Sequence, residues 1–173
     1  MHFRRRAFRH GGGAGMSTTD DRPNRLPWPP MIYIAAAALA VILHWLVPLP
    51  WIPPSFGEFL FAVGWLVIAA ALAIDVAAMR VMRRAKTTIM PHRASDHLVT
   101  GGPFSFTRNP IYVGNTMLMV GIGLIAGIVW FLVLAPLAAY ATTKLAIERE
   151  ERHLEARFGK KYRDYRKKVR RWL

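Results

Sequence analysis

Apolar residues gather in three long blocks along the 173-residue chain, separated by polar and basic segments. The first covers residues 31–47, the second covers 58–79, and the third runs from Ile111 to Ile147. A helix crosses the hydrocarbon core of a bilayer, about 30 Å thick, with about 20 residues, so the third block is too long for one crossing. We therefore divide it near Gly127 into a helical hairpin. The pattern predicts an all-α integral membrane protein with about four transmembrane helices, the last two forming that hairpin.

The segment after the last apolar block predicts a cytoplasmic C-terminal amphipathic helix over residues 148–173. Its apolar side chains share one helical face, and they are Ile147, Leu154, Phe158, Tyr162, Tyr165 and Val169. Glu150 and Glu151 fall within the same arc, and carboxylates on a buried face need a cation or a hydrogen-bond donor. One alternative is that Glu148 pairs with Arg152 and the other acids pair with Lys or Arg one turn away. The other alternative is a functional carboxylate pair.

Basic residues set the expected orientation, because Lys and Arg flank membrane helices mainly on the cytoplasmic side. They are numerous in residues 1–30, in the loop over residues 80–110 and in the C-terminal segment, whereas residues 48–57 and 127–130 contain none. We therefore expect a multi-pass protein of the inner (cytoplasmic) membrane with both termini in the cytoplasm. Residues 1–30, rich in Arg, Gly and Pro, predict a disordered basic tail that either binds anionic lipid or only sets the topology.

The composition of the chain excludes several kinds of chemistry. The net charge of +14 is spread along membrane flanks rather than gathered on one module, so nucleic-acid binding is not expected. The absence of cysteine excludes disulfides, a thiolate nucleophile and thiolate metal ligands. His92 and His97 stand close in sequence without a third ligand, so no metal site is expected.

The loop before the third apolar block carries an unusual polar passage, LVTGGPFSFTRNPIYVG, at residues 98–114. Its Gly101, Gly102 and Pro103 permit a tight turn. This passage, followed by the pattern EEx(2)Lx(3)FGx(2)Yx(2)Y, resembles the isoprenylcysteine carboxyl methyltransferase family and its relative, phosphatidylethanolamine N-methyltransferase. The resemblance covers roughly the C-terminal half of the chain, from Thr87 to the end, and combines two separate motifs in the right order.

Members of these families are integral membrane enzymes that use S-adenosylmethionine, so the resemblance implies a methyltransferase with that cofactor. It implies that the cofactor site is formed by Leu98, Val99, Phe104, Arg108, Asn109, Pro110, Tyr112, Gly114, Glu150 and Glu151. Among them Arg108, Asn109 and Glu150 are the expected catalytic residues. The families' usual Arg-His-Pro reads Arg-Asn-Pro here, so position 109 can form hydrogen bonds but cannot titrate near neutral pH. An Arg expected one turn before Glu150 is absent, because position 146 is Ala, which argues against copying the eukaryotic substrate.

The chemistry of S-adenosylmethionine suits these residue types. Its adenine needs an apolar or aromatic slot, which Phe104, Phe106 and Tyr112 can supply. A carboxylate of the Glu pair can meet its ammonium group, while Arg108 can bind its carboxylate through two parallel hydrogen bonds. Methyl transfer from sulfur asks for alignment and exclusion of water more than for a covalent catalyst.

A further small motif, Gly121-Ile122-Gly123, has two interpretations. In phosphatidylethanolamine methyltransferases a Gly-x-Gly accompanies the Glu pair at the cofactor, whereas small residues in membrane helices more often permit close packing. His44 and Asp75 lie within apolar blocks, and we expect both to reach the membrane interface.

Two classes of function are compatible with the sequence. The first is an S-adenosylmethionine-dependent methyltransferase acting on a membrane-embedded or hydrophobic small acceptor, a carboxylate, amine or thiol, at the cytoplasmic interface. The alternative is a non-catalytic lipid-binding membrane adaptor or subunit, in which the Glu pair only balances Arg. We expect a tail over residues 1–30, a transmembrane domain over 31–147 and a C-terminal helix over 148–173 that completes the cofactor site.

Overall fold

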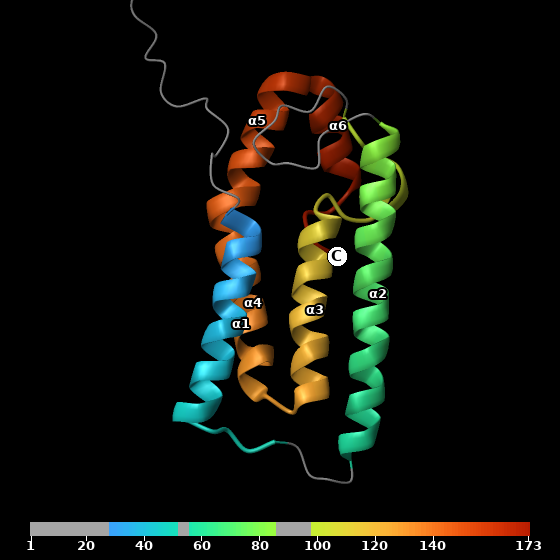
Figure 1. The fold of residues 1–173 in the computed structure, drawn as a ribbon. Helices are drawn as coiled ribbons and strands as arrows, with labels where there is room; N and C mark the ends of the chain where they lie inside the picture. Colours follow the sequence, from blue (N-terminus) through green and yellow to red (C-terminus); the bar gives the residue numbers. More distant parts are fainter. Residues whose placement is uncertain (1–27, 52–55, 86–97) are drawn as a thin grey trace, which may run out of the picture.

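The computed structural model describes residues 28–51, 56–85 and 98–173, and within these ranges the ordered structure is helical apart from one isolated bridge. Four long helices lie side by side (Figure 1). They are α1 (Trp28–Leu46), α2 (Gly57–Arg84), α3 (Pro110–Ala126) and α4 (Val129–Thr142). The all-α prediction is therefore confirmed for the described residues.

Two predicted segments lie outside the described residues. The basic tail expected over residues 1–30 falls almost wholly within the undescribed residues 1–27. The middle of the 80–110 loop, residues 86–97, falls outside them as well, and with it His92 and His97.

Three helices in the described part of the chain are long and apolar enough to cross a membrane. By length and composition these are Pro29–Leu46, Gly57–Arg84 and Val129–Phe158. The remaining predicted crossing, α3, has 17 residues and spans about 25 Å at about 1.5 Å per residue. Large apolar side chains such as Ile34, Trp45 and Leu66 are exposed, as expected for a surface that contacts lipid. Four crossings therefore stay a prediction, of which three meet the length and hydropathy expected of a span.

The described residues of the two loops without Lys or Arg lie at the same end of the bundle. Trp130 donates its indole N–H to the carbonyl of Val47 at 2.8 Å, and the ring of Trp51 lies against Gly127. Gly127 ends α3 with φ 67°, so the third apolar block divides at the predicted residue. Arg84 ends α2 at the opposite end of the bundle (Figure 1).

Glycines bring α2 and α4 close to α3. A Cβ atom added at Gly121 would lie 2.6 Å from Ile68 Cγ1 and 3.0 Å from the carbonyl oxygen of Gly64, both on α2. A Cβ added at Gly123 would lie 2.7 Å from Cβ of Phe131 on α4. The Gly-x-Gly motif therefore serves helix packing on two sides of α3, which is a common role of small residues in membrane helices.

Substituting Gly121 tests this packing. Gly121→Val is expected to destabilise the protein by about 1–3 kcal/mol, the usual effect of overpacking, because part of what the new side chain meets is backbone. Thermal unfolding of the detergent-solubilised protein, followed by helical circular dichroism, measures the change. Gly57→Val is the matched control, since a Cβ at Gly57 meets nothing within 4 Å. Equal melting temperatures for the two variants would contradict the packing role.

The buried core lies where α1, α3 and α4 meet. It is formed by Tyr33, Ala40, Met119, Phe131, Leu134, Ala135 and Ala138. The hydroxyl of Tyr33 forms a 2.6 Å hydrogen bond with Thr116 Oγ1, which satisfies the one polar atom that the ring brings into this core. This contact links α1 to the N-terminal half of α3.

The chain continues beyond α4 as a helix. A π-helical turn, η3 (Thr143–Ile147), leads into α5 (Glu148–Phe158). A second short helix, α6 (Lys160–Lys168), follows, and residues 169–173 are not helical. In Figure 1, α5 and α6 lie together at the end of the bundle where α2 ends.

The prediction of a single helix over residues 148–173 is wrong. Gly159 adopts φ 52° and ψ −121°, a backbone conformation that glycine tolerates and other residues rarely adopt, and it breaks the helix in two. The break lets α6 turn away from α5. Tyr162 and Val169 of the predicted apolar stripe are nevertheless buried.

Candidate functional site

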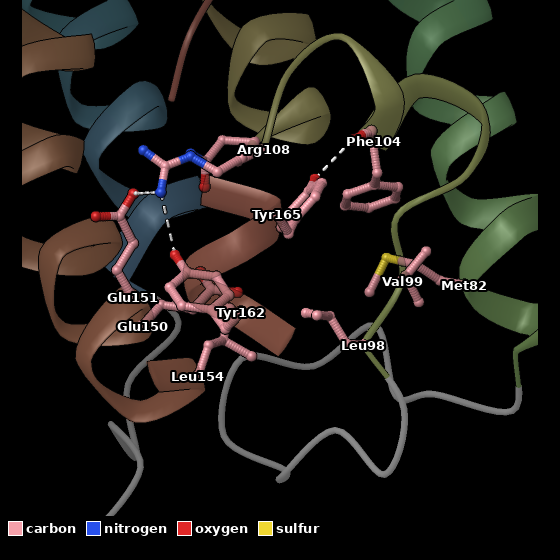
Figure 2. A pocket seen from close by; sticks show the side chains of 11 residues that line it. Met82, Leu98, Val99, Phe104, Arg108, Glu150, Glu151, Leu154, Tyr162 and Tyr165 are labelled. Carbon is pink, nitrogen blue, oxygen red and sulfur yellow. Dashed lines mark hydrogen bonds and ion pairs between the residues drawn. The ribbon is translucent and has the colours of Figure 1, made fainter. Parts of the chain in front are cut away.

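A pocket lies where the end of α2, the loop before α3, α5 and α6 meet (Figure 2). Including its open mouth, the pocket has an empty volume of about 580 Å³. Its walls are formed by Met82, Leu98, Val99, Phe104, Arg108, Asn109, Glu150, Glu151, Leu154, Tyr162 and Tyr165. Figure 2 shows Arg108, Glu151 and Tyr162 on one side, with Met82 and Val99 on the other. The pocket therefore combines a polar wall with an apolar one.

Most residues predicted for the cofactor site line this pocket. They are Leu98, Val99, Phe104, Arg108, Asn109, Glu150 and Glu151. The other three, Pro110, Tyr112 and Gly114, are not among its lining residues. Pro110 is buried as the first residue of α3. Gly114 packs so closely on α2 that a Cβ there would clash with the carboxylate of Asp75.

The predicted position of Asp75 at the membrane interface stays a prediction. Its carboxylate lies against Gly114 between α2 and α3, and its Oδ1 is buried with no hydrogen-bond partner in the described part of the chain. The close approach of these two helices explains why this oxygen is buried, although Asp75 as a whole is partly exposed.

Local backbone geometry brings the loop before α3 to the pocket. Gly102 adopts φ 60°, and a Cβ there would lie 2.8 Å from Cγ2 of Val81 on α2. The short 3₁₀ helix η2 (Gly102–Ser105) begins at this residue, and its Pro103 is buried. The predicted tight turn is thus confirmed, and it places Phe104 in the wall of the pocket.

Arg108 connects this loop to both C-terminal helices. Its Nη1 lies 3.1 Å from Oε1 of Glu151 on α5 and donates to the hydroxyl of Tyr162 on α6 at 3.3 Å (Figure 2). The side chains of Arg108 and Glu151 are only 10% and 9% exposed, so the ion pair is shielded from water. The Nε of Arg108 is buried and meets no acceptor among the described residues. Since buried donors are nearly always paired, this N–H is a candidate to bind a ligand.

A second arginine, from the far end of the chain, holds Glu151. Arg171 donates from Nε to Oε1 at 3.0 Å and from Nη2 to Oε2 at 2.7 Å, the paired geometry that favours arginine over lysine. Hydrogen bonding to Glu151 raises the pKa of Arg171. The hypothesis that the acids pair only with neighbours one turn away is therefore wrong for Glu151. Glu148 does pair with a residue one turn away, but that residue is Lys144, at 2.7 Å, whereas the expected partner was Arg152.

Glu150 differs from its neighbour in both exposure and partners. Its side chain lines the pocket and is exposed, and its Oε2 accepts a hydrogen bond from the hydroxyl of Tyr112 at 3.4 Å. Tyr112 thus contributes by orienting Glu150 rather than by lining the pocket. Glu150 is free to meet a positively charged group that enters from the open side.

The side-chain nitrogen of Asn109 forms a hydrogen bond within the protein. Its Nδ2 donates to the carbonyl of Arg171 at 2.9 Å, and its backbone N–H donates to Oγ1 of Thr107 at 3.2 Å. The side-chain oxygen is the part of Asn109 that is left for a ligand. Position 109 therefore ties the loop to residues 169–173, a contact that no sequence pattern predicted.

Two tyrosines of α6 complete the pocket, although the sequence indicated them as members of an apolar stripe and of the C-terminal motif and not as pocket residues. Tyr165 donates its hydroxyl to the carbonyl of Phe104 at 2.6 Å, and burial raises the pKa of Tyr165 to about 12. The Tyr165 hydroxyl therefore keeps its proton and fixes the loop. Phe106, which we expected in the aromatic slot, is instead 49% exposed and does not line the pocket. Met82 and Arg171 were not predicted at all, because no spacing or motif marks them.

Comparisons with known proteins give a family and one relative. The model of the phospholipid methyltransferase family matches residues 59–161, which is more than half of the chain. A protein of Haemophilus influenzae, named only as uncharacterized, is 36% identical over 63 residues, covering 36% of this chain and 79% of that protein. No solved structure matches the chain. The family match includes Arg108 and the Glu pair, and it ends before Arg171.

Proposed function

Because the chain belongs to the phospholipid methyltransferase family, we propose that it transfers a methyl group from S-adenosylmethionine to a membrane-embedded or hydrophobic small acceptor. The observation that carries this proposal is the 3.1 Å contact between Arg108 and Glu151. It joins the loop before α3 to the acidic helix, two segments far apart in sequence, around one pocket. The apolar helices support a membrane protein, and the family supports methyltransferase chemistry.

The residues of the pocket fit the cofactor. Its lining residues supply apolar surface together with a few charged and polar groups, the combination typical of small-molecule sites. Arg108 offers a buried, unpaired Nε–H to a carboxylate, and Glu150 offers a carboxylate to an ammonium group. Phe104, Tyr162 and Leu98 offer aromatic and apolar surface to an adenine ring. We assign Asn109 a contact with the cofactor through its side-chain oxygen only.

When bound, S-adenosylmethionine supplies a methyl carbon on a positively charged sulfur, which departs as a neutral thioether when the acceptor's lone pair forms the new bond. The protein's contribution is to hold the reacting groups in line and to keep water away. Arg108 and Glu150 would orient the polar end of the cofactor, while Tyr165 holds Phe104 and closes the wall. This role requires no covalent nucleophile from the protein.

We propose that the pocket faces the cytoplasm in the inner membrane, with both termini on that side. The basic helix α6 and Arg83 and Arg84 of α2 stand at the pocket end of the bundle, whereas the loops without Lys or Arg stand at the other. The positive-inside rule then assigns the pocket end to the cytoplasm. In this position a water-soluble cofactor and an acceptor from the lipid can meet at the interface.

Binding of S-adenosylhomocysteine to detergent-purified protein, measured by calorimetry, tests the proposal. We expect binding to the unsubstituted protein and roughly tenfold weaker binding to Glu150→Gln, the loss expected for one charge-assisted hydrogen bond of about 1.5 kcal/mol. Glu148→Gln is the matched control, because Glu148 pairs with Lys144 and does not line the pocket. No binding to monodisperse, folded protein would favour the non-catalytic lipid-binding adaptor instead.

The acceptor can be identified directly. Membranes that contain the protein are incubated with methyl-labelled S-adenosylmethionine, and the labelled product is identified by mass spectrometry. The matched control is membrane that contains the Glu150→Gln variant. A labelled lipid or hydrophobic acid, amine or thiol that depends on the unsubstituted protein would support the proposed acceptor class.

A further inference from the structure

We propose that Arg171 is a positioning residue that binds Glu151 and thereby leaves Arg108 able to bind the carboxylate of the cofactor. This inference rests on the proposed function and extends it to a residue beyond the region that the family model matches. Arg171 does not line the pocket, so it would act through Glu151 and Arg108.

The backbone around Arg171 is fixed against the loop before α3. The Arg108 N–H donates to the carbonyl of Arg170 at 2.9 Å, and Thr107 and Arg170 form a parallel bridge. The carbonyl of Arg171 accepts hydrogen bonds from Thr107 Oγ1 at 3.2 Å and from Asn109 Nδ2 at 2.9 Å. Arg171 therefore has a defined position relative to Arg108, because both belong to the same small hydrogen-bonded unit.

The next residue fixes the other side of this unit. Trp172 donates its indole N–H to Oγ1 of Thr143 at 3.2 Å, in the π-helical turn that precedes α5. Thr143 Oγ1 in turn donates to the carbonyl of Ala139 at 2.9 Å. Residues 170–172 thus link the Arg108 loop to the start of the helix that carries the Glu pair. The side chain of Arg171 meets Glu151 within this link.

The two arginines bind the carboxylate of Glu151 to different extents. Arg171 contacts both carboxylate oxygens through Nε and Nη2, whereas Arg108 contacts only Oε1, through Nη1. Arg108 therefore keeps donors that Glu151 does not use, and its Nε is buried without an acceptor in the described ranges. The nearby Glu148 lies 3.9 Å from Arg171 Nη1 but is already bound by Lys144 at 2.7 Å. One buried carboxylate thus faces two guanidinium groups, and a further anion is favoured beside Arg108.

Loss of Arg171 would change this balance in a specific way. Glu151 would be left with Arg108 as its cationic partner, and the two could form the side-on pair that Arg171 now forms. Arg108 would then have fewer donors and less positive charge to offer to a carboxylate. The hydrogen bond from the Tyr165 hydroxyl to the carbonyl of Phe104, elsewhere in the pocket, would be unchanged.

Two probes separate this role from a merely structural one. S-adenosylhomocysteine carries the amino acid carboxylate, whereas methylthioadenosine has the same adenosine and thioether without it. We expect Arg171→Gln to weaken binding of S-adenosylhomocysteine by about tenfold or more, the loss of one charge-assisted contact, and to leave binding of methylthioadenosine unchanged. Lys168→Gln, which removes one exposed charge from the end of α6, is the matched control and should bind both probes normally.

A second substitution should reverse the effect. If Glu151 blocks Arg108 once Arg171 is gone, then Glu151→Gln added to Arg171→Gln should restore binding of S-adenosylhomocysteine. A residue that only supports the fold would not be rescued by removing another contact. If Arg171→Gln does not yield folded protein, the affinities of Arg171→Lys for the two probes are measured instead. Lysine keeps the charge but loses the paired geometry.

The outcomes are distinguishable. Equal losses for both probes, an unchanged affinity for S-adenosylhomocysteine, or failure of the double substitution to restore it would each overturn the role of Arg171. Absence of binding of both probes to the unsubstituted protein would instead overturn the proposed function on which this inference rests.

Discussion

Glu151→Ala is expected to reduce the free energy of unfolding by about 3–5 kcal/mol, the range measured when one partner of a buried ion pair is removed. The Glu151 side chain is 9% exposed and lies between Arg108 and Arg171, at 3.1 and 2.7 Å. Alanine would leave two guanidinium groups facing each other without a counter-charge, one of them only 10% exposed. The loop before α3 and residues 169–173 would lose their common contact with α5.

Unfolding of the detergent-solubilised variant, followed by circular dichroism or by tryptophan fluorescence, measures this change. Glu155→Ala is the matched control on the same helix. Glu155 pairs with Arg163 at 3.9 Å and with Arg166 at 3.3 Å, but its side chain is 37% exposed, so its loss should change stability by less than about 1 kcal/mol. If both variants unfolded alike, Glu151 would not be the centre of a stabilising buried cluster.

Hydropathy predicted the helices well because burial in lipid constrains every residue of a crossing. The apolar blocks match α1, α2 and the α3–α4 hairpin, and the hairpin turns at Gly127 as expected. Pro110 begins α3 because its ring suits the first position of a helix. In each case the information is local, so the sequence alone was sufficient.

The C-terminal segment was predicted less well because its structure depends on contacts with distant residues. The periodicity placed Tyr162 and Val169 correctly on a buried face, yet it could not reveal that Gly159 breaks the helix. Many Lys and Arg follow, and nothing local distinguishes Arg171 from Arg170. It is the pairing of Arg170 with Thr107 that places Arg171, the next residue, against Glu151.

The candidate site shows the same division between local and long-range information. Arg108 and the Glu pair were indicated by their motifs, and their proximity followed from the resemblance to a family. The different environments of Glu150 and Glu151 were not indicated, since both fall in one helical arc. Tyr112 on α3 binds Glu150, and Arg108 binds Glu151, so partners from other segments separate the two.

Arg108→Ala should affect function far more than stability, which distinguishes it from Glu151→Ala. Its removal leaves Glu151 bound to Arg171 through both carboxylate oxygens, so no buried charge is left unpaired. The proposed cofactor, however, would lose the only guanidinium in the described wall of the pocket. We expect kcat/KM for methyl transfer to fall about 100-fold, which corresponds to about 2.7 kcal/mol of lost interaction with the cofactor.

Initial rates at varied concentrations of S-adenosylmethionine, together with thermal unfolding of the same preparation, check this expectation. Arg163→Ala is the matched control, because Arg163 is 55% exposed on α6 and lies outside the pocket. A melting temperature well above that of Glu151→Ala, combined with the loss of activity, would assign Arg108 to the cofactor rather than to the fold. Full activity in Arg108→Ala would contradict that assignment, because no other arginine of the described wall could replace its charge.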